Sequence, residues 1–398
     1  MKLNRRHLLA GATLIAAARA RPGRAAKDPI RIGVPTALTG PYADLGNQVK
    51  RATDFAVDAA NEAGGIDGRQ VEVRYLDTEG RADLAREQGE KLALSGYNLL
   101  MSTIASGEGL AIGPQLQRWN AIYISTVNKA DDITGKACNR RMFRVNHPDS
   151  SDVAVVQPWL KQQKQRKWAI QAGDTAWGHN SGMSFSNAAQ ADGRIVEVEQ
   201  YSPFGTNDYA PYIQKIVDSG AEGLWVALAG RDAITFAQQA RQFGLLDNVF
   251  TAGVSFIADN QVKTLGDAAK GIVGIINYSS TLDTPGNKAF VAAWQKKYPG
   301  TTPTNFEAEG YLGTEVLFQA VKKAGSVVPA DVGRAMEGTT FATIFGDALL
   351  RKEDHQLMTP NFFGYVGIVD GVAKPIINMT VAADVAFPQP NGNCKLTG

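Results

Sequence analysis

Residues 98–134 constrain the fold of this chain more than any other stretch. Two short apolar runs, 99–104 and 121–125, have the composition of buried strands, and a helical segment separates them. Strands joined through a helix run parallel, so the turns that follow both strands lie at the same edge of the sheet. Open α/β sheets bind their ligands at this carboxyl edge. The pattern therefore predicts a parallel sheet with a candidate binding edge.

Both turns at that edge are rich in small and polar residues. They comprise Ala105, Ser106 and Gly107 in the first and Thr126, Val127, Asn128 and Lys129 in the second. Hydroxyls and free backbone N–H groups in such turns form a natural cradle for a carboxylate. The alternative is that both turns are ordinary connections between a strand and a helix. The spacing alone leaves these two interpretations open.

The alternation of strands and helices extends over most of the chain. A length of 398 residues with 44% hydrophobic content suits two domains. Strands are expected at 30–36, 71–76, 168–172, 195–201, 224–229, 249–253 and 272–277, with a β-rich tail at 362–379. Regular alternation with helices predicts doubly wound parallel sheets. We therefore expect two α/β units of similar architecture without sequence repetition.

Residues 1–26 have the pattern of an export signal. Basic residues precede an apolar run at 8–18, and small residues follow it. Because the run is too short to span a bilayer, we expect a cleaved signal peptide and a periplasmic protein, exported by the Sec or the twin-arginine route. Without this segment the chain holds 35 basic and 39 acidic side chains, a net charge of −4. That charge gives no basis for binding nucleic acid or an anionic membrane.

Cys138 and Cys394 are the only cysteines of the sequence. An exported chain meets an oxidising compartment, so we expect a disulfide between them, with two free thiols as the alternative. The cysteines and the four histidines are scattered without the spacing of metal ligands. We therefore expect no metal and no cofactor.

Several short motifs share their order and spacing with a known family. They are LTGPYADLG at 38–46, AGGIDG at 63–68, SGEGLA at 106–111, LAGRDAITFAQQARQFG at 228–244 and RKEDHQ at 351–356. With these motifs the chain resembles the periplasmic solute-binding proteins of ABC transporters that are related to the leucine/isoleucine/valine-binding protein. The similarity covers essentially the whole chain after the signal.

The resemblance implies two doubly wound α/β lobes of the periplasmic-binding-protein-like type I fold, joined by a three-stranded hinge. Lobe 1 would comprise residues 27–147 plus 278–357, and lobe 2 would comprise residues 148–277 plus 358–398. The resemblance also implies a monomer that closes around a small molecule and presents it to a membrane permease.

The pocket implied by the resemblance lies between the lobes. Ser106 matches a serine that holds the ligand carboxylate, and Trp177 falls at the position of an aromatic lid. The family's threonine position is Lys129, and Val254 falls where amino-acid binders have the glutamate that pairs with the ligand ammonium. The expected site residues are Tyr42, Ala105, Ser106, Thr126, Val127, Asn128, Lys129, Trp177, Ala229, Gly230 and Val254.

This pattern predicts a small aromatic or apolar carboxylate as the ligand. A buried ammonium without a carboxylate partner costs several kcal/mol, so the site should disfavour zwitterionic amino acids. Branched-chain amino acid binding is the alternative, as the family name suggests.

Several residues also have simpler interpretations. Lys129 is either a charge for the ligand or a solvated side chain at the cleft mouth, and Arg231 is a surface or hinge residue rather than a ligand clamp. Residues 149–151 suit a helix N-cap. Residues 354–356 have no role that the sequence explains.

The sequence gives little support to an enzyme. Gly107, Gly109 and Gly113 miss the dinucleotide-binding pattern by one position, and no other catalytic motif is found. We therefore expect a binding protein. A ligand-presenting subunit of a sensor with the same fold remains the alternative to transport.

Overall fold

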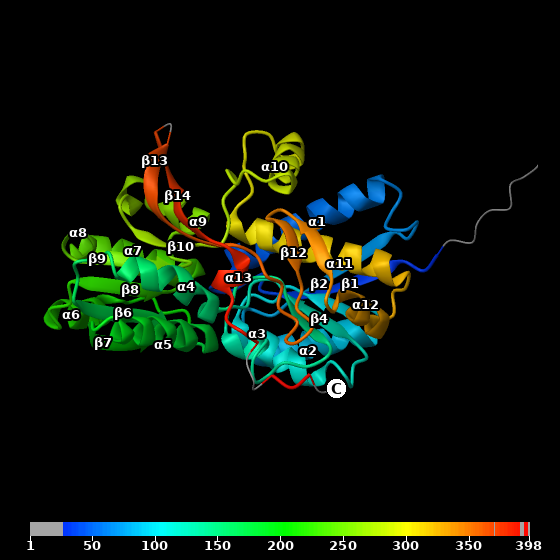
Figure 1. Ribbon diagram of the computed structural model, residues 1–398, viewed down its shortest axis with the longest axis horizontal. Helices are drawn as coiled ribbons and strands as arrows, with labels where there is room; N and C mark the ends of the chain where they lie inside the picture. The colour runs from blue at the N-terminus through cyan, green and yellow to red at the C-terminus, as the bar shows by residue number, and fades with distance from the viewer. Residues whose placement is uncertain (1–26, 370, 391–393, 397–398) are drawn as a thin grey trace, which may run out of the picture.

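The protein consists of two α/β lobes that lie side by side (Figure 1). The computed structural model describes residues 27–369, 371–390 and 394–396. The expected signal peptide, residues 1–26, lies outside the described residues. Within the described ranges, no helix is long and apolar enough to cross a membrane.

Lobe 1 is built on a five-stranded parallel sheet with the order β2-β1-β3-β4-β5. Its strands are β1 (Ile30–Thr36), β2 (Val71–Asp77), β3 (Leu99–Met101), β4 (Ile122–Ser125) and β5 (Met142–Arg144). Its helices are α1 (Ala43–Glu62), α2 (Ala82–Leu94), α3 (Ser106–Ile112), α10 (Pro285–Lys297), α11 (Asn305–Ala324) and α12 (Pro329–Met336). Short 3₁₀ turns lie at Gly113–Gln115 and Asp131–Ile133, and β11 (Thr340–Thr343) with β12 (Gly346–Leu349) forms a hairpin that the sequence did not predict. The predicted strand–helix–strand unit of residues 98–134 thus lies in this sheet.

Lobe 2 is built on a seven-stranded sheet with the order β14-β13-β10-β9-β8-β6-β7. Its strands are β6 (Lys167–Gly173), β7 (Ile195–Ser202), β8 (Gly223–Ala227), β9 (Phe250–Val254), β10 (Val273–Ile276), β13 (Asn361–Val369) and β14 (Val372–Val381). Its helices are α4 (Asp149–Leu160), α5 (Ala176–Ala191), α6 (Ala210–Asp218), α7 (Gly230–Gln242), α8 (Leu245–Asn248), α9 (Asp259–Leu265) and α13 (Ala383–Ala386), with a 3₁₀ turn at Gly266–Ala269. The strands β6 to β10 run parallel, whereas β13 and β14 are antiparallel.

Helix α1 begins at Ala43, within the motif of residues 38–46. The Gly-Pro composition of residues 38–46 suggests a loop, yet Gly46 already lies within the helix. A Cβ atom at Gly46 would lie 1.8 Å from the carbonyl oxygen of Ala37, so only glycine allows the helix to approach the end of β1 this closely. The close approach brings Tyr42 to the carboxyl edge of the sheet.

The chain passes between the two sheets three times, in residues 145–148, 277–284 and 350–360. The Gln356 side chain joins two of these crossings: its Oε1 accepts a 2.6 Å hydrogen bond from Arg144 Nε, and its Nε2 donates to the carbonyl of Asn146 at 2.8 Å. His355 stacks on Phe143 with ring centroids 4.3 Å apart. Residues 354–356, for which the sequence explained no role, therefore hold the crossings together.

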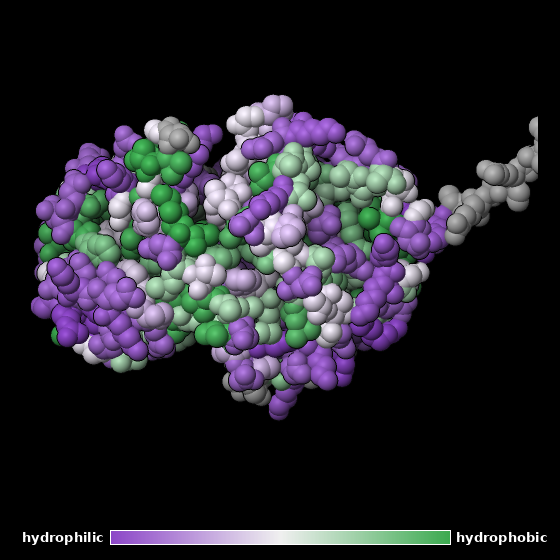
Figure 2. Space-filling view, turned by 45° about the horizontal axis from the view of Figure 1, so that its top comes forward, coloured by the Kyte–Doolittle hydropathy of each residue, from purple (hydrophilic) through white to green (hydrophobic). Residues whose placement is uncertain are grey.

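The β13–β14 hairpin projects from lobe 2 (Figure 1). Figure 2 shows apolar surface at its tip, where Ile368, Val369 and Val372 are exposed. The hairpin extends beyond the helices that cover the rest of the sheet, so these side chains have no core to pack against.

The tail after β14 returns from lobe 2 to lobe 1. Helix α13 packs against α4, and Phe387 stacks on His147 with ring centroids 5.7 Å apart. Cys394 then forms a disulfide with Cys138 of lobe 1. A covalent link thus closes a loop of 256 residues and fastens the tail across the crossings.

We predict that Cys138→Ser lowers the free energy of unfolding. Opening so long a loop removes up to about 4–5 kcal/mol in the loop-entropy model. Urea unfolding of the non-reduced protein measures the change. Cys394→Ser and the double variant should lose the same amount, because all three lack one and the same bond. Equal unfolding midpoints for the oxidised and the reduced wild type would contradict this.

Candidate ligand-binding site

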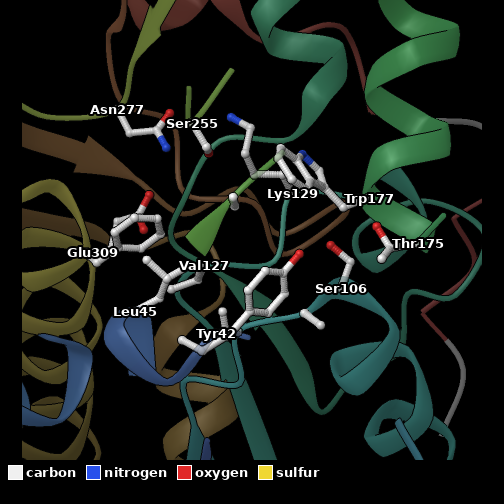
Figure 3. Close-up of a pocket in the computed structure, with 14 residues that line it drawn as sticks. Tyr42, Leu45, Ser106, Val127, Lys129, Thr175, Trp177, Ser255, Asn277 and Glu309 are labelled. Atoms are coloured by element: carbon white, nitrogen blue, oxygen red, sulfur yellow. The ribbon is translucent and has the colours of Figure 1, made fainter. Parts of the chain in front are cut away.

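A cavity of about 440 Å³ lies between the lobes, at the carboxyl edge of the lobe 1 sheet (Figure 3). The loops after β3 and β4 face α5 and the loop after β8 across it. Its lining residues are Tyr42, Leu45, Ile104, Ala105, Ser106, Val127, Lys129, Thr175, Trp177, Ala229, Ser255, Asn277, Phe306 and Glu309. Seven of the eleven expected site residues line this cavity: Tyr42, Ala105, Ser106, Val127, Lys129, Trp177 and Ala229.

Asn128, which was expected to contact the ligand, instead holds the first turn in place. Its Nδ2 donates to the carbonyls of Thr103, Ile104 and Ala105 at 2.9–3.2 Å. Its Oδ1 accepts from the Tyr123 hydroxyl at 2.6 Å. With both ends of its amide occupied in the interior, Asn128 positions the turn that carries Ser106.

Backbone N–H groups of the first turn are partly occupied by the protein itself. The buried Glu108 carboxylate accepts from the N–H of Ala105 at 2.6 Å and from that of Ile104 at 3.0 Å. Burial raises the pKa of Glu108 to about 7. The cradle of free N–H groups that the sequence suggested is therefore smaller than expected, and hydroxyls supply much of the donor capacity here.

Three hydroxyl groups gather at one end of the cavity. Figure 3 shows the side-chain oxygens of Ser106, Thr175 and Tyr42 on the same side. Ser106 Oγ accepts from the N–H of Ala130 at 3.1 Å, and Thr175 Oγ1 accepts from the N–H of Gly178 at 3.0 Å. A hydroxyl that accepts one bond keeps its proton for donation. Burial raises the pKa of Tyr42, so this hydroxyl also stays protonated and can donate. We call these three residues the hydroxyl end.

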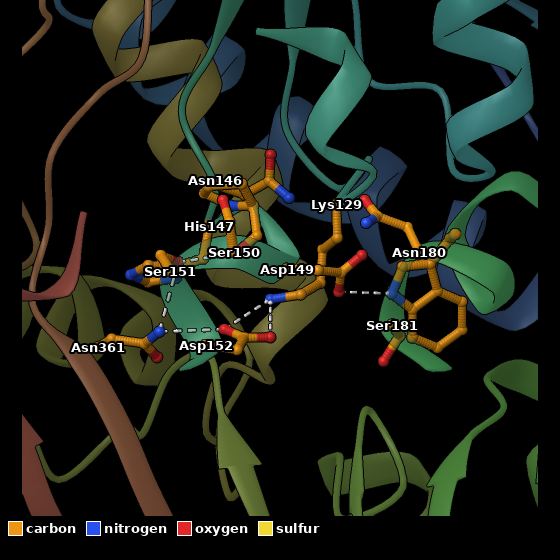
Figure 4. Close-up of polar contacts among 12 residues, drawn as sticks. Lys129, Asn146, His147, Asp149, Ser150, Ser151, Asp152, Asn180, Ser181 and Asn361 are labelled. Atoms are coloured by element: carbon orange, nitrogen blue, oxygen red, sulfur yellow. Dashed lines mark hydrogen bonds and ion pairs between the residues drawn. The ribbon is translucent and has the colours of Figure 1, made fainter. Parts of the chain in front are cut away.

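Lys129 is buried rather than solvated, with 4% of its surface exposed. Its Nζ lies 3.0 Å from a carboxylate oxygen of Asp152 on α4 (Figure 4). Asn361 Nδ2 donates to the same carboxylate at 3.0 Å. The solvated interpretation of Lys129 is wrong because helix α4 places an acidic partner beside it.

The N-cap interpretation of residues 149–151 is also wrong. Pro148 occupies the N-cap of α4, and the side chain that bonds the first turn comes from lobe 1, where Asp131 Oδ1 accepts from the N–H of Ser150 at 2.9 Å. Asp149 Oδ1 instead accepts from Trp177 Nε1 at 3.2 Å (Figure 4). Burial raises the pKa of Asp149 and of Asp152, and Lys129 acts in the opposite direction on both. The bond from Trp177 fixes the indole in the cavity wall.

The remaining expected site residues do not line the cavity. Val254 is fully buried in the apolar core of lobe 2, and the next residue, Ser255, reaches the cavity instead. Thr126 Oγ1 donates to Ser102 Oγ at 3.0 Å. Gly230, at a φ of 58°, lies against the loop of Pro41, where a Cβ atom would be 2.7 Å from the carbonyl oxygen.

Arg231 has an exposed side chain, but its backbone N–H donates to the carbonyl of Pro41 at 3.0 Å. The exposed side chain agrees with the expected surface position, and the backbone takes part in the contact between the lobes.

Glu309 and Asn277 are cavity residues that the sequence reasoning missed. Glu309 comes from α11 and is 6% exposed. Burial raises its pKa to about 8, while Lys129 and a hydrogen bond from Asn277 act in the opposite direction. The sequence did contain a signal for a buried acid: Glu309 lies three residues from both Phe306 and Leu312, on the apolar face of the helix.

A second cavity of about 240 Å³ adjoins the first and shares Ser255 and Asn277 with it. Asp259 lines this second space, and its Oδ2 accepts from the backbone N–H of Asn305 at 3.1 Å. The site is therefore an elongated space between the lobes.

Two parallel-rich α/β lobes around an interlobe cavity define a ligand-binding protein of the type I periplasmic binding fold. The periplasmic binding protein family model matches residues 29–371, and the chain belongs to this family, whose members are substrate-binding proteins rather than enzymes.

The similar proteins agree with this assignment. The Leu/Ile/Val-binding protein homolog 3 of Brucella melitensis is 25% identical over 339 residues, which cover 84% of this chain and 90% of that protein. A solute-binding protein of an ABC transporter from Rhodopseudomonas palustris, solved with 3,4-dihydroxybenzoic acid, superposes with a TM-score of 0.83 at 22% identity, covering 90% and 98% of the two chains. Another from the same species, solved with benzoate, also gives 0.83 at 22% identity, covering 92% and 100%.

We predict that Lys129→Met destabilises the fold by about 3–5 kcal/mol, because it leaves the buried Asp152 carboxylate without its cation. Adding Asp152→Leu should restore much of that loss. Urea unfolding measures both. As a control, Lys91→Met breaks the exposed pair with Glu87 and should change stability by less than about 1 kcal/mol. A loss at Lys129→Met no larger than that of the control would contradict the buried-pair argument.

We also predict that Glu309→Gln alters the pH dependence of stability. The folded protein holds the Glu309 proton up to a pKa of about 8, against an ordinary value of 4.5. The resulting stabilisation is fully present below about pH 4.5 and is lost as the pH rises through 8. Melting temperatures between pH 5 and 9 should therefore fall more steeply for the wild type than for Glu309→Gln. The exposed control Glu353→Gln should follow the wild type, and parallel curves for all three would refute the prediction.

Proposed function

We propose that this protein captures a small aromatic carboxylate in the interlobe cavity and delivers it to the membrane permease of an ABC importer, in the periplasm. The observation that carries the proposal is the hydroxyl end beside an apolar wall. Ser106, Thr175 and Tyr42 supply donors for a carboxylate, and Trp177 offers a flat, fixed face for a ring. The R. palustris proteins solved with benzoate and 3,4-dihydroxybenzoic acid support this ligand class.

Branched-chain amino acids are the competing ligands, because the curated relatives carry the name of Leu/Ile/Val-binding proteins. The cavity does contain an acidic residue, Glu309, although not at the expected position 254. The ammonium and the carboxylate of an amino acid are both bonded to the α-carbon, so the two charges stay close together. Glu309 and the hydroxyl end lie on opposite sides of the cavity (Figure 3), an arrangement that does not match the adjacent charges of an amino acid. This separation favours the aromatic acid.

The contacts between the lobes support closure around the ligand. Asn180 on α5 donates to the Asp131 carboxylate at 3.2 Å, and the Asp259 carboxylate accepts from the backbone N–H of Asn305 at 3.1 Å. We propose that lobes 27–147 plus 278–357 and 148–277 plus 358–398 move as units about the three crossings, while the disulfide tethers the end of the tail to lobe 1. Breaking these few polar contacts would open the cavity to solvent, and re-forming them would present one continuous surface to the permease.

Calorimetry tests this proposal. We expect benzoate-type acids to bind in the micromolar range or better and leucine, isoleucine and valine much more weakly. Trp177→Ala should weaken the aromatic acid by about 1–3 kcal/mol, because it removes buried stacking area. The exposed control Phe243→Ala should leave the affinity unchanged. Tight leucine binding without a response to any aromatic acid, or chemical conversion of the bound acid, would refute the proposal.

A further inference from the structure

The end of the cavity opposite the hydroxyl end carries an unsatisfied polar atom. Glu309 lines the cavity, is more than nine-tenths buried, and its Oε2 has no hydrogen-bond partner among the described residues. An unpaired buried polar atom destabilises the folded state. An unpaired atom that faces a cavity is explained if the site binds a group that forms a hydrogen bond with it.

Neighbouring residues hold this acid toward the cavity. Asn277 hydrogen-bonds to Glu309, and its own Oδ1 has no partner among the described residues. Ser255 adopts a φ of 57°, a conformation that is uncommon for residues other than glycine. Its side chain thereby lines the cavity, while that of Val254 packs in the core. Strained backbone of this kind is concentrated at ligand sites.

The charge state of Glu309 limits which ligand group can fit. With a pKa of about 8, the group carries its proton at neutral pH and can donate a hydrogen bond. A ligand hydroxyl can accept that bond and donate its own proton to Ser255 or Asn277. An ammonium group can only donate, and it would require Glu309 to ionise. A methyl group would leave the acid unsatisfied.

We propose that Glu309, with Ser255 and Asn277, forms a subsite for a hydroxyl group on the ligand ring, at the end away from the ligand carboxylate. The ligand is then a hydroxy-substituted aromatic acid that spans the cavity from the hydroxyl end to Glu309. This inference rests on the proposed function and specifies the substituent that the same site selects.

The experiment compares 4-hydroxybenzoate with 4-methylbenzoate, which has a similar shape but no hydroxyl. Calorimetry on the wild type should show a preference for the hydroxy acid of at least about tenfold, because only this ligand satisfies Glu309. In Glu309→Leu the preference should vanish through weaker binding of the hydroxy acid, while the methyl acid binds as well or better. Glu309→Gln, which keeps a donor and an acceptor, should retain part of the preference for the hydroxy acid.

Glu315→Gln is the matched control, since Glu315 lies on the same helix but does not line the cavity. It should leave the preference unchanged. If Glu309→Leu does not fold, as judged by its melting curve, the Glu309→Gln ratio decides the question: a ratio equal to that of the wild type overturns the subsite.

Two further outcomes separate this inference from the proposed function. Equal affinities of the wild type for the two acids, or equal losses for both acids in Glu309→Leu, would overturn the hydroxyl subsite and leave aromatic-acid binding intact. Binding of leucine with no response to either acid would overturn both.

Discussion

The structure depends on one buried ion pair, between Lys129 of lobe 1 and Asp152 of lobe 2. Removing two charges from water is costly, and only close pairing with further hydrogen bonds offsets that cost. Asn361 supplies one such bond to Asp152, and the carbonyl of Lys129 accepts from the N–H of Asp149 at 3.0 Å. The pair therefore fixes the loop after β4 against the first turn of α4. The cavity wall is set by this junction.

The same junction determines the charge that a ligand meets. The positive charge of Lys129 is paired with Asp152. Burial raises the pKa values of the carboxyl groups of Asp149, Asp152 and Glu309. Protonation of Glu309, whose pKa is raised to about 8, lowers the negative charge around the cavity. An anionic ligand can then enter a space that contains several acidic side chains, with neutral hydroxyls rather than a free cation at its carboxylate. This arrangement agrees with the proposed aromatic carboxylate.

Much of the fold could be predicted from the sequence because the relevant signals are local. The alternation of apolar strands with helices marked the parallel strands of both sheets, and the turn at Ser106 lines the cavity. The hairpin of β11 and β12 was missed, since its strands of four residues give little periodicity. Gly and Pro at 40–46 resemble a loop, yet α1 begins at Ala43, and Gly46 is required there for close packing.

The sequence by itself determined which residues form the two turns, that Trp177 follows the strand at 168–172, and that two cysteines are available for pairing. Only the tertiary structure decided what surrounds them. Lys129 is buried because Asp152, 23 residues later, meets it across the lobe junction. Glu309 enters the site because α11 returns from the far part of the chain to cover lobe 1. Periodicity shows which face of a helix is buried, but the groups opposite that face come from distant segments, and these groups set burial, charge and pKa.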